Sequence, residues 1–182
     1  MPRILTRAAV LLAATLVLAG CTASPPAPSI TADGASGDVI FGTGYSFAVP
    51  EDWGVPDPIE GFDPDALAAD LDDTDGFADN VNVILSPAGE VTPEQVESAG
   101  VDELEGAGAT DVTVRDRVTI AGGESAHLSA TLAAQGTEYA IEQFYTTSDG
   151  QTYVVTFSFS PTVSQGDRDA LTDSVLATWT WT

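Results

Sequence analysis

Four stretches in the C-terminal half of the chain alternate apolar and polar residues and are separated only by short turns. A period of two residues is typical of β-strands, whose side chains point to opposite faces in turn. Asp149-Gly150, between the last two stretches, is the strongest short hairpin signal in the sequence. Because such short turns join antiparallel neighbours, the pattern predicts an antiparallel β-meander. The four stretches are "DVTVRDRVTI" (111–120), "ESAHLSATLAA" (124–134), "TEYAIEQFYTT" (137–147) and "TYVVTFSFS" (152–160).

Two further strands are predicted before the meander. Tyr45, Phe47 and Val49 alternate with polar or small residues until Pro50 ends the pattern. The second strand lies in "NVNVILSP" (80–87), where apolar residues again recur at every second position. An extended segment is also expected at the end of the chain, in "TWTWT" (178–182).

Three segments carry helix signals. Thr92 and Gln95 have the spacing of a capping box, so we expect a helix from 92 to about 106. A short helix is predicted over 63–71, with an aspartate cap and a proline in its first turn, and a last helix over 167–177. Strands mostly in one block, with helices near the start, middle and end, indicate an α+β fold in which helices cover an antiparallel sheet.

The N-terminus has the pattern of a lipoprotein signal. Arg3 and Arg7 precede an apolar run over residues 8–20 that is shorter than the roughly 20 residues needed to span a bilayer. The run ends in "LAGC", which resembles the bacterial lipobox, so we expect cleavage after residue 20 and lipidation of Cys21. The alternative is an ordinary cleaved signal with a stray cysteine. Two acyl chains at Cys21 would hold the protein on a membrane.

The rest of the chain divides into a linker and a domain. Residues 21–38 are rich in Pro, Ser, Ala and Gly and predict a lipidated N-terminus followed by a disordered linker. Residues 39–182 suit a single domain. After loss of residues 1–20, the 28 acidic residues face three arginines, a net charge of −25. Such a surface repels nucleic acid, whose binding depends on cationic side chains, so we expect no nucleic-acid partner.

Several of these segments resemble a known family. "GYSFAVPEDW", "NVNVILSP", "AGGESAHLSATL", "YAIEQFYTTSDGQTYVVTFSFSP" and a terminal helix ending in tryptophan are similar to the LpqN-like lipoproteins of actinobacteria and, more broadly, to the PsbP-like fold. The similarity extends over residues 41–180. It implies an antiparallel sheet packed between helices, a PsbP-like αβα sandwich, in a cell-envelope lipoprotein. The resemblance brings no catalytic residues to this sequence.

Three groups of residues are candidate sites. His127, the only histidine, is expected to be a surface or half-buried structural residue, because no nucleophile pattern accompanies it. The aspartate-rich loop Asp70–Asp79 fails the EF-hand pattern, so a solvated turn is favoured over a weak divalent-cation site. Trp179 and Trp181 are either core residues or an exposed aromatic strip.

These observations favour a binding protein over an enzyme. We expect a non-enzymatic binding or scaffold module, anchored through Cys21 on the outer face of the cytoplasmic membrane, with an envelope protein or a small molecule as its partner. No catalytic residue, metal ligand or cofactor is assigned. An envelope hydrolase or transferase, which would need a deep pocket with convergent polar groups around His127 or a buried carboxylate pair, remains the alternative.

Overall fold

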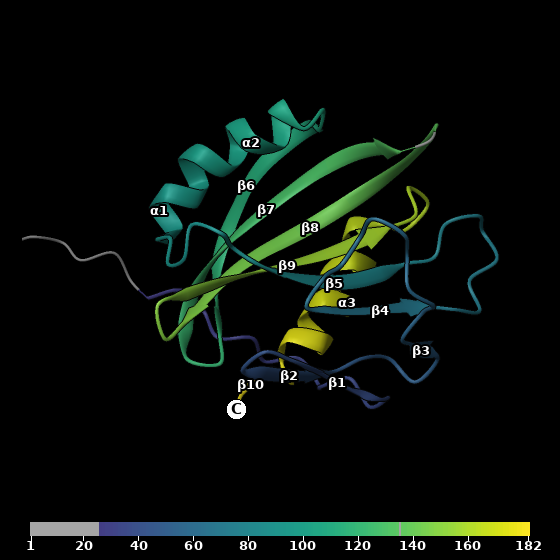
Figure 1. Cartoon of the computed structure of the whole chain (residues 1–182), viewed down its shortest axis with the longest axis horizontal. Coiled ribbons are helices and arrows are strands. Elements are labelled where there is room, and N and C mark those ends of the chain that lie inside the picture. The colour runs from purple at the N-terminus through teal and green to yellow at the C-terminus, as the bar shows by residue number, and fades with distance from the viewer. Residues whose placement is uncertain (1–25, 135) are drawn as a thin grey trace, which may run out of the picture.

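The computed structural model describes residues 26–134 and 136–182. Its centre is a seven-stranded antiparallel sheet in the order β3-β4-β5-β9-β8-β7-β6 (Figure 1). The predicted meander is confirmed, because β6 to β9 follow one another along the chain and lie side by side. The strands are β3 (Trp53–Gly54), β4 (Ala66–Asp70), β5 (Asn80–Leu85), β6 (Thr110–Ile120), β7 (Gly123–Ala134), β8 (Thr137–Ser148) and β9 (Gln151–Phe159).

The turn between β8 and β9 forms where the sequence predicts it. Asp149 and Gly150 have φ values of 50° and 79°. Positive φ at both central residues gives the turn a twist that matches the right-handed twist of the flanking strands. The register then pairs Ser148 with Gln151 and continues along the full length of β9, to Phe159 opposite Ala140.

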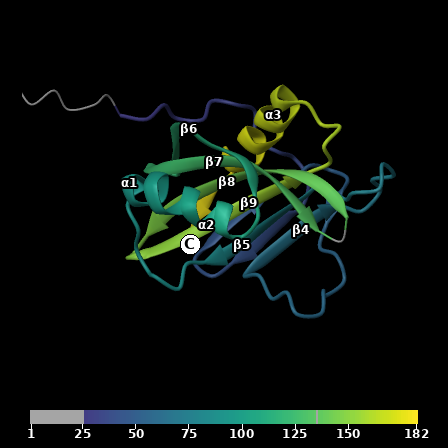
Figure 2. The same cartoon turned by 90° about the horizontal axis from the view of Figure 1, so that it is seen from above.

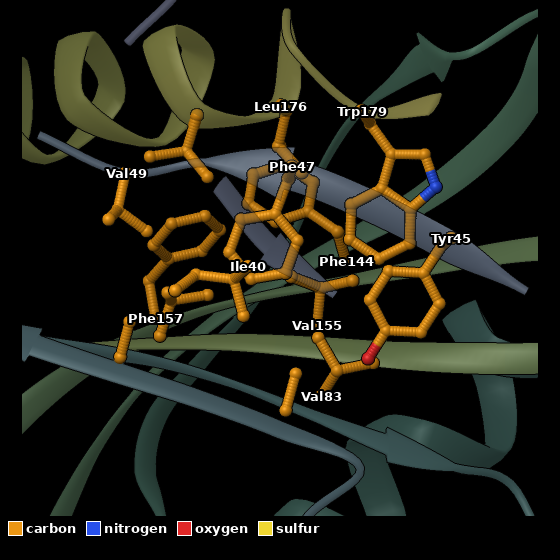
Figure 3. Packing of buried hydrophobic residues seen from close by; sticks show 14 of the residues in the cluster. Ile40, Tyr45, Phe47, Val49, Val83, Phe144, Val155, Phe157, Leu176 and Trp179 are labelled. Atoms are coloured by element: carbon orange, nitrogen blue, oxygen red, sulfur yellow. The ribbon is translucent and has the colours of Figure 1, made fainter. Parts of the chain in front are cut away.

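One face of the large sheet is covered by a small sheet and the last helix. The small sheet consists of β1 (Val39–Gly42), β2 (Tyr45–Ala48) and β10 (Thr180–Trp181), and the helix is α3 (Gln165–Leu176). Between these layers lies the main core, where Tyr45, Phe47 and Trp179 stack with ring centroids 4.5–6.2 Å apart (Figure 3). Trp179 is therefore a core residue, and Trp181 is half-buried against Tyr153.

The opposite face carries one continuous helical segment (Figure 2). Its first residues form the predicted capping box, in which the Thr92 backbone N–H donates to the Gln95 side chain and the Gln95 N–H donates to the Thr92 hydroxyl. The segment packs on a second core that includes Leu128 and Ile141. Its parts are α1 (Pro93–Gln95), the π-helical turn η1 (Val96–Gly100) and α2 (Val101–Gly106).

The helix predicted over 63–71 is wrong, because this segment contains strand β4. Ala66 and Ala68 are buried in the main core, and Ala66 pairs with Val83 of β5. Alanine favours a helix locally, but small side chains also fit a strand that is buried beneath a second sheet. Pairing with β5 therefore overrides the local preference.

The structure also differs from the predicted linker over residues 27–37. Ile30 and Ala35 pack against the main core, and the Ala35 N–H donates to the Ser174 carbonyl of α3. These contacts join residues far apart in the sequence, so the composition of the segment does not reveal them. We call residues 27–37 the N-terminal strap.

Candidate functional site

A hollow lies between the helical segment and the large sheet. The helices contact the sheet at β6 and β7 and leave the outer face of β5 and β9 partly uncovered. The resulting space, which we call the helix–sheet groove, has a volume of about 530 Å³. Its lining residues are Ile84, Ser86, Pro87, Ala88, Val91, Gln95, Val96, Ser98, Ala99, Gly100, Glu103, Leu104, Gln143, Tyr145, Val154 and Thr156.

Apolar side chains from both layers form most of this lining. Ile84 of β5 and Val154 of β9 point away from the main core, and Ile84 remains 44% exposed. Gly100 lets the helix approach the sheet, since a Cβ added there would lie 3.0 Å from Leu128 Cδ1. The groove therefore lies beside the close contact that Gly100 permits near the middle of the helical segment.

A short chain of hydrogen bonds runs across the floor of the groove. Tyr145 donates its hydroxyl proton to Gln143 Oε1 over 2.6 Å, and Gln143 Nε2 donates to Thr156 Oγ1 over 2.8 Å. Burial, together with the charge of Glu103, raises the pKa of Tyr145 to about 12. The tyrosine is therefore neutral near pH 7, and the floor offers neutral polar groups within an apolar wall.

This composition suits ligand binding. Small-molecule sites typically enclose about 300–1,000 Å³ and combine apolar walls with a few oriented polar groups. Among the described lining residues, Glu103 is the only carboxylate, and no histidine or arginine is present. The groove can hold an apolar group and orient one neutral polar function at Gln143.

His127 lies on the other face of the sheet, where it is buried. The prediction of a surface or half-buried position is wrong, because His127 is only 7% exposed and stacks on Phe144 at a centroid distance of 4.0 Å. Its Nε2 lies 2.8 Å from Glu142 Oε2. The carboxylate partner and the aromatic ring make burial of a histidine possible, and sequence alone does not show either contact.

Glu142 connects His127 to helix α3. Gln165 Nε2 and Arg168 Nε donate to Glu142 Oε1 over 2.8 and 3.1 Å. Burial alone would raise the pKa of Glu142, but the hydrogen bonds from His127, Gln165 and Arg168 outweigh it and lower the pKa below its ordinary value. The hydrogen bond that the structure gives the His127 ring is thus to a carboxylate rather than to a serine or threonine hydroxyl.

The aspartates of the loop between β4 and β5 bind backbone groups of the protein itself. Asp73 and Asp75 each accept the N–H of the residue two positions later, and Asp79 accepts the Ser160 N–H over 2.7 Å. Within residues 26–134 and 136–182, no group of three or more His, Cys, Asp or Glu side chains is placed to hold a metal ion. In the described residues, the loop Asp70–Asp79 does not assemble the ligands that the weak cation site considered in the sequence analysis would need.

Cys21 and the expected cleavage position before it lie outside the described residues. Within the described part of the chain, every helix is too short or too polar to traverse a bilayer.

Comparisons with known proteins identify the fold. No protein-family model matches the chain, and no curated protein matches its sequence significantly. The cyanobacterial PsbP of Synechocystis is similar in structure, with a TM-score of 0.53 and 19% identity over 79% of this chain and 91% of that one. The chain has the PsbP-like fold. The predicted α+β architecture is thereby confirmed.

Two further solved structures are similar. LpqN, a protein involved in cell envelope biogenesis of Mycobacterium tuberculosis, has a TM-score of 0.51 and 16% identity over 76% of this chain and 83% of its own. A Bacteroides thetaiotaomicron protein has a TM-score of 0.48 and 16% identity over 79% of this chain. The present chain spans about half of that protein, 48% of its length.

The sequence did not predict the groove. One signal was available: β5 and β9 carry apolar residues on both faces, since Ile84 and Val154 alternate with Val83 and Val155. Strands of this kind are typically covered on both sides. Here the second face is covered only in part.

Proposed function

We propose that this protein is a non-enzymatic binding module of the cell envelope. In this proposal it is an LpqN-like lipoprotein, anchored by acyl chains at Cys21 to the outer face of the cytoplasmic membrane. Its ligand is a neutral molecule with an apolar body that fits the helix–sheet groove. The observation that carries the proposal is the groove itself, about 530 Å³ in volume and lined mainly by apolar side chains.

The envelope location is supported by two separate observations. The sequence before Cys21 has the order expected of a lipoprotein signal: a basic start, a short apolar run and "LAGC". The fold is shared with LpqN, which is involved in cell envelope biogenesis in its own organism. A lipid anchor would also account for the single cysteine, because a lipidated sulfur cannot oxidise or pair.

The charge of the protein limits the ligand. The described lining contains one charged group, Glu103, and the whole chain carries a net charge of −23. An anionic group at the groove would meet a carboxylate and an acidic protein without a cation in the lining to pair with. A neutral ligand meets no such penalty and can still hydrogen-bond to Gln143 or Thr156.

A dye titration tests binding at the groove. N-phenyl-1-naphthylamine, a neutral apolar dye, should bind the chain from residue 21 onward, made with Cys21→Ser so that no acyl chain is attached. Ala99→Trp places an indole in the groove and should weaken binding at least tenfold. Ala133→Trp, an exposed alanine of β7 outside the lining, is the matched control and should bind as the parent does. Equal binding by both variants, or none by the parent, would refute the proposal.

Membrane fractionation tests the anchor separately. The exported protein should have the mass of residues 21–182 plus acyl groups and should sediment with washed membranes. The Cys21→Ala variant should be released. An unacylated mass, or retention of the alanine variant in washed membranes, would disprove lipidation at Cys21 without bearing on the groove.

The absence of an enzymatic role can be tested at His127. The alternative of an envelope hydrolase or transferase requires turnover of cell-wall material that depends on this residue. Turnover by the purified protein that disappears in His127→Gln, with the fold retained, would replace the binding proposal by the enzymatic one.

A further inference from the structure

The N-terminal strap is fixed to the edge of the large sheet. Thr119, near the end of β6, donates its N–H to the Pro28 carbonyl and its hydroxyl to the Ala27 carbonyl, each over 2.8 Å. Ser29 forms a parallel bridge with the same residue. β6 is the outermost strand on this side, so the strap satisfies backbone groups that the sheet leaves open.

Contacts further along the strap hold it in place. The Gly37 N–H donates to the Val49 carbonyl over 2.8 Å, and a Cβ added at Gly37 would overlap the Pro50 carbonyl. A Cβ at Gly34 would lie 2.8 Å from Thr178 Cγ2. At Gly37 the chain thus passes so close to the backbone of the domain that only glycine fits, and at Gly34 a larger residue would require Thr178 to shift. The strap is a packed part of the domain.

This packing shortens the distance between the domain and the expected anchor. The chain advances by six residues from Cys21 to Ala27, which span at most about 20 Å in any conformation. A free linker that reached residue 38 would allow nearly three times that length. In contrast, β7 alone is about 40 Å long. The anchor can therefore reach only one corner of the sheet.

That corner lies where β6 ends (Figure 1). It carries the turn between β6 and β7 and, beside it, the turn between β8 and β9, since Gly123 and Thr147 lie in contact distance. The aspartate-rich loop Asp70–Asp79 lies at the diagonally opposite corner. β5 begins there at Asn80, which pairs with Ser158 at the far end of β9.

We infer that the strap orients the anchored domain, with the β6–β7 and β8–β9 turns facing the bilayer and the loop Asp70–Asp79 facing away. This inference rests on the proposed lipid anchor at Cys21. The orientation keeps the five aspartates of the loop away from anionic headgroups, whereas the two turns that face the bilayer carry one, Asp149. It also bears on the proposed function: Ala88 of the groove lining is next to Gly89, where an added Cβ would lie 3.6 Å from the Gly150 carbonyl oxygen, so one end of the groove lies beside the β8–β9 turn.

Fluorescence quenching on vesicles tests the orientation. Because acylation consumes the only native cysteine, a cysteine introduced elsewhere is the single site for a thiol-reactive bimane. The acylated protein carries Ala121→Cys, in the β6–β7 turn, or Thr74→Cys, in the opposite loop; both positions are exposed. Each is placed in phosphatidylcholine vesicles that contain a lipid with a nitroxide on its headgroup. Quenching should be at least threefold stronger at position 121 than at 74.

The outcomes separate the two proposals. Equal quenching at both positions, or stronger quenching at 74, on protein that floats with the vesicles would overturn the orientation and leave the anchor intact. Protein that does not float with the vesicles would overturn both. Gly37→Ala in the Ala121→Cys background should release the strap and reduce quenching toward the value at 74, while Gly166→Ala should leave it unchanged.

Discussion

At the scale of single residues, Glu142 is the side chain that joins the meander to helix α3. It is fully buried and accepts hydrogen bonds from His127, Gln165 and Arg168. A buried ion pair gives little net stability relative to apolar residues, but removal of one partner leaves the other charge buried and uncompensated. Removal of one partner should therefore lower the stability of the fold by more than the intact contact contributes to it.

Replacement of Glu142 should show this asymmetry. Glu142→Gln keeps the shape but leaves Arg168 without its carboxylate, so the free energy of unfolding should fall by about 3 kcal/mol. Glu94→Gln removes an exposed partner of Arg117 and should lower the free energy of unfolding far less, because solvent screens the pair. Urea unfolding of the two variants measures the difference. Similar losses in both would show that Glu142 is not buried as described.

The raised pKa of Asp79 predicts an unusual pH dependence of the stability of the fold. Burial, together with the charges of Asp73, Asp75 and Asp70, raises its pKa to about 6. A carboxyl group whose pKa is higher in the folded than in the unfolded state destabilises the fold when it is ionised. The contribution of Asp79 to the free energy of unfolding should therefore rise as the pH falls from 7.5 to 5. The pKa of Glu142 is lowered, so its contribution is lost only at more acidic pH.

The variant Asp79→Asn isolates this effect. Asparagine keeps an oxygen that can accept the Ser160 N–H but carries no charge. Urea unfolding at pH 7.5 and pH 5 should show a smaller pH difference for the variant than for the parent, by about 1 kcal/mol, since Asp79 is only partly shielded from solvent. An identical pH difference in both proteins would contradict the raised pKa.

At the scale of elements, local patterns predicted the strands of the meander and the helical segment that begins at Thr92. Each depends on neighbours in sequence: alternation for the strands and a capping box for the helix. The helix predicted over 63–71 fails because β4 is determined by its pairing with β5. The composition of residues 27–37 predicts a linker, whereas the packing of the strap depends on Thr119 and Ser174, which are distant in sequence.

The groove could not be predicted for the same reason. It depends on where the helical segment lies across the sheet, and this placement follows from the contacts of Val96 and Leu104 with the second core. The capping box predicts where the helix starts but not which strands it leaves uncovered. Apolar residues on both faces of β5 and β9 were the only local sign.

Glycine substitutions test the strap as an element. Gly37→Ala should lower the free energy of unfolding by about 1–3 kcal/mol, because the added methyl group overlaps the Pro50 carbonyl. Gly166→Ala, in α3 with open space around its Cβ, is the matched substitution and should be neutral or stabilising by up to about 1 kcal/mol. Thermal or urea unfolding compares them. A neutral Gly37→Ala would mean that residues 27–37 are not packed.

At the scale of the whole molecule, the acidic charge and the apolar groove together define the ligand class. N-phenyl-1-naphthylamine and 8-anilino-1-naphthalenesulfonate share an aromatic skeleton and differ by one sulfonate. At low salt the neutral dye should bind more tightly than the sulfonate. The difference in affinity between the two dyes should become smaller as salt screens the charges. Equal affinities at low salt, measured by fluorescence titration, would show that the charge of the protein does not select the ligand.

The central claim is that an apolar molecule binds between the helical segment and the sheet, and amide chemical-shift mapping by NMR tests it most directly. On titration with N-phenyl-1-naphthylamine, shifts should concentrate at groove residues such as Ile84, Ala99 and Tyr145. The amides of His127 on the opposite face and of Asp75 in the distant loop should not move. Shifts centred on His127, or spread evenly over the domain, would contradict the account.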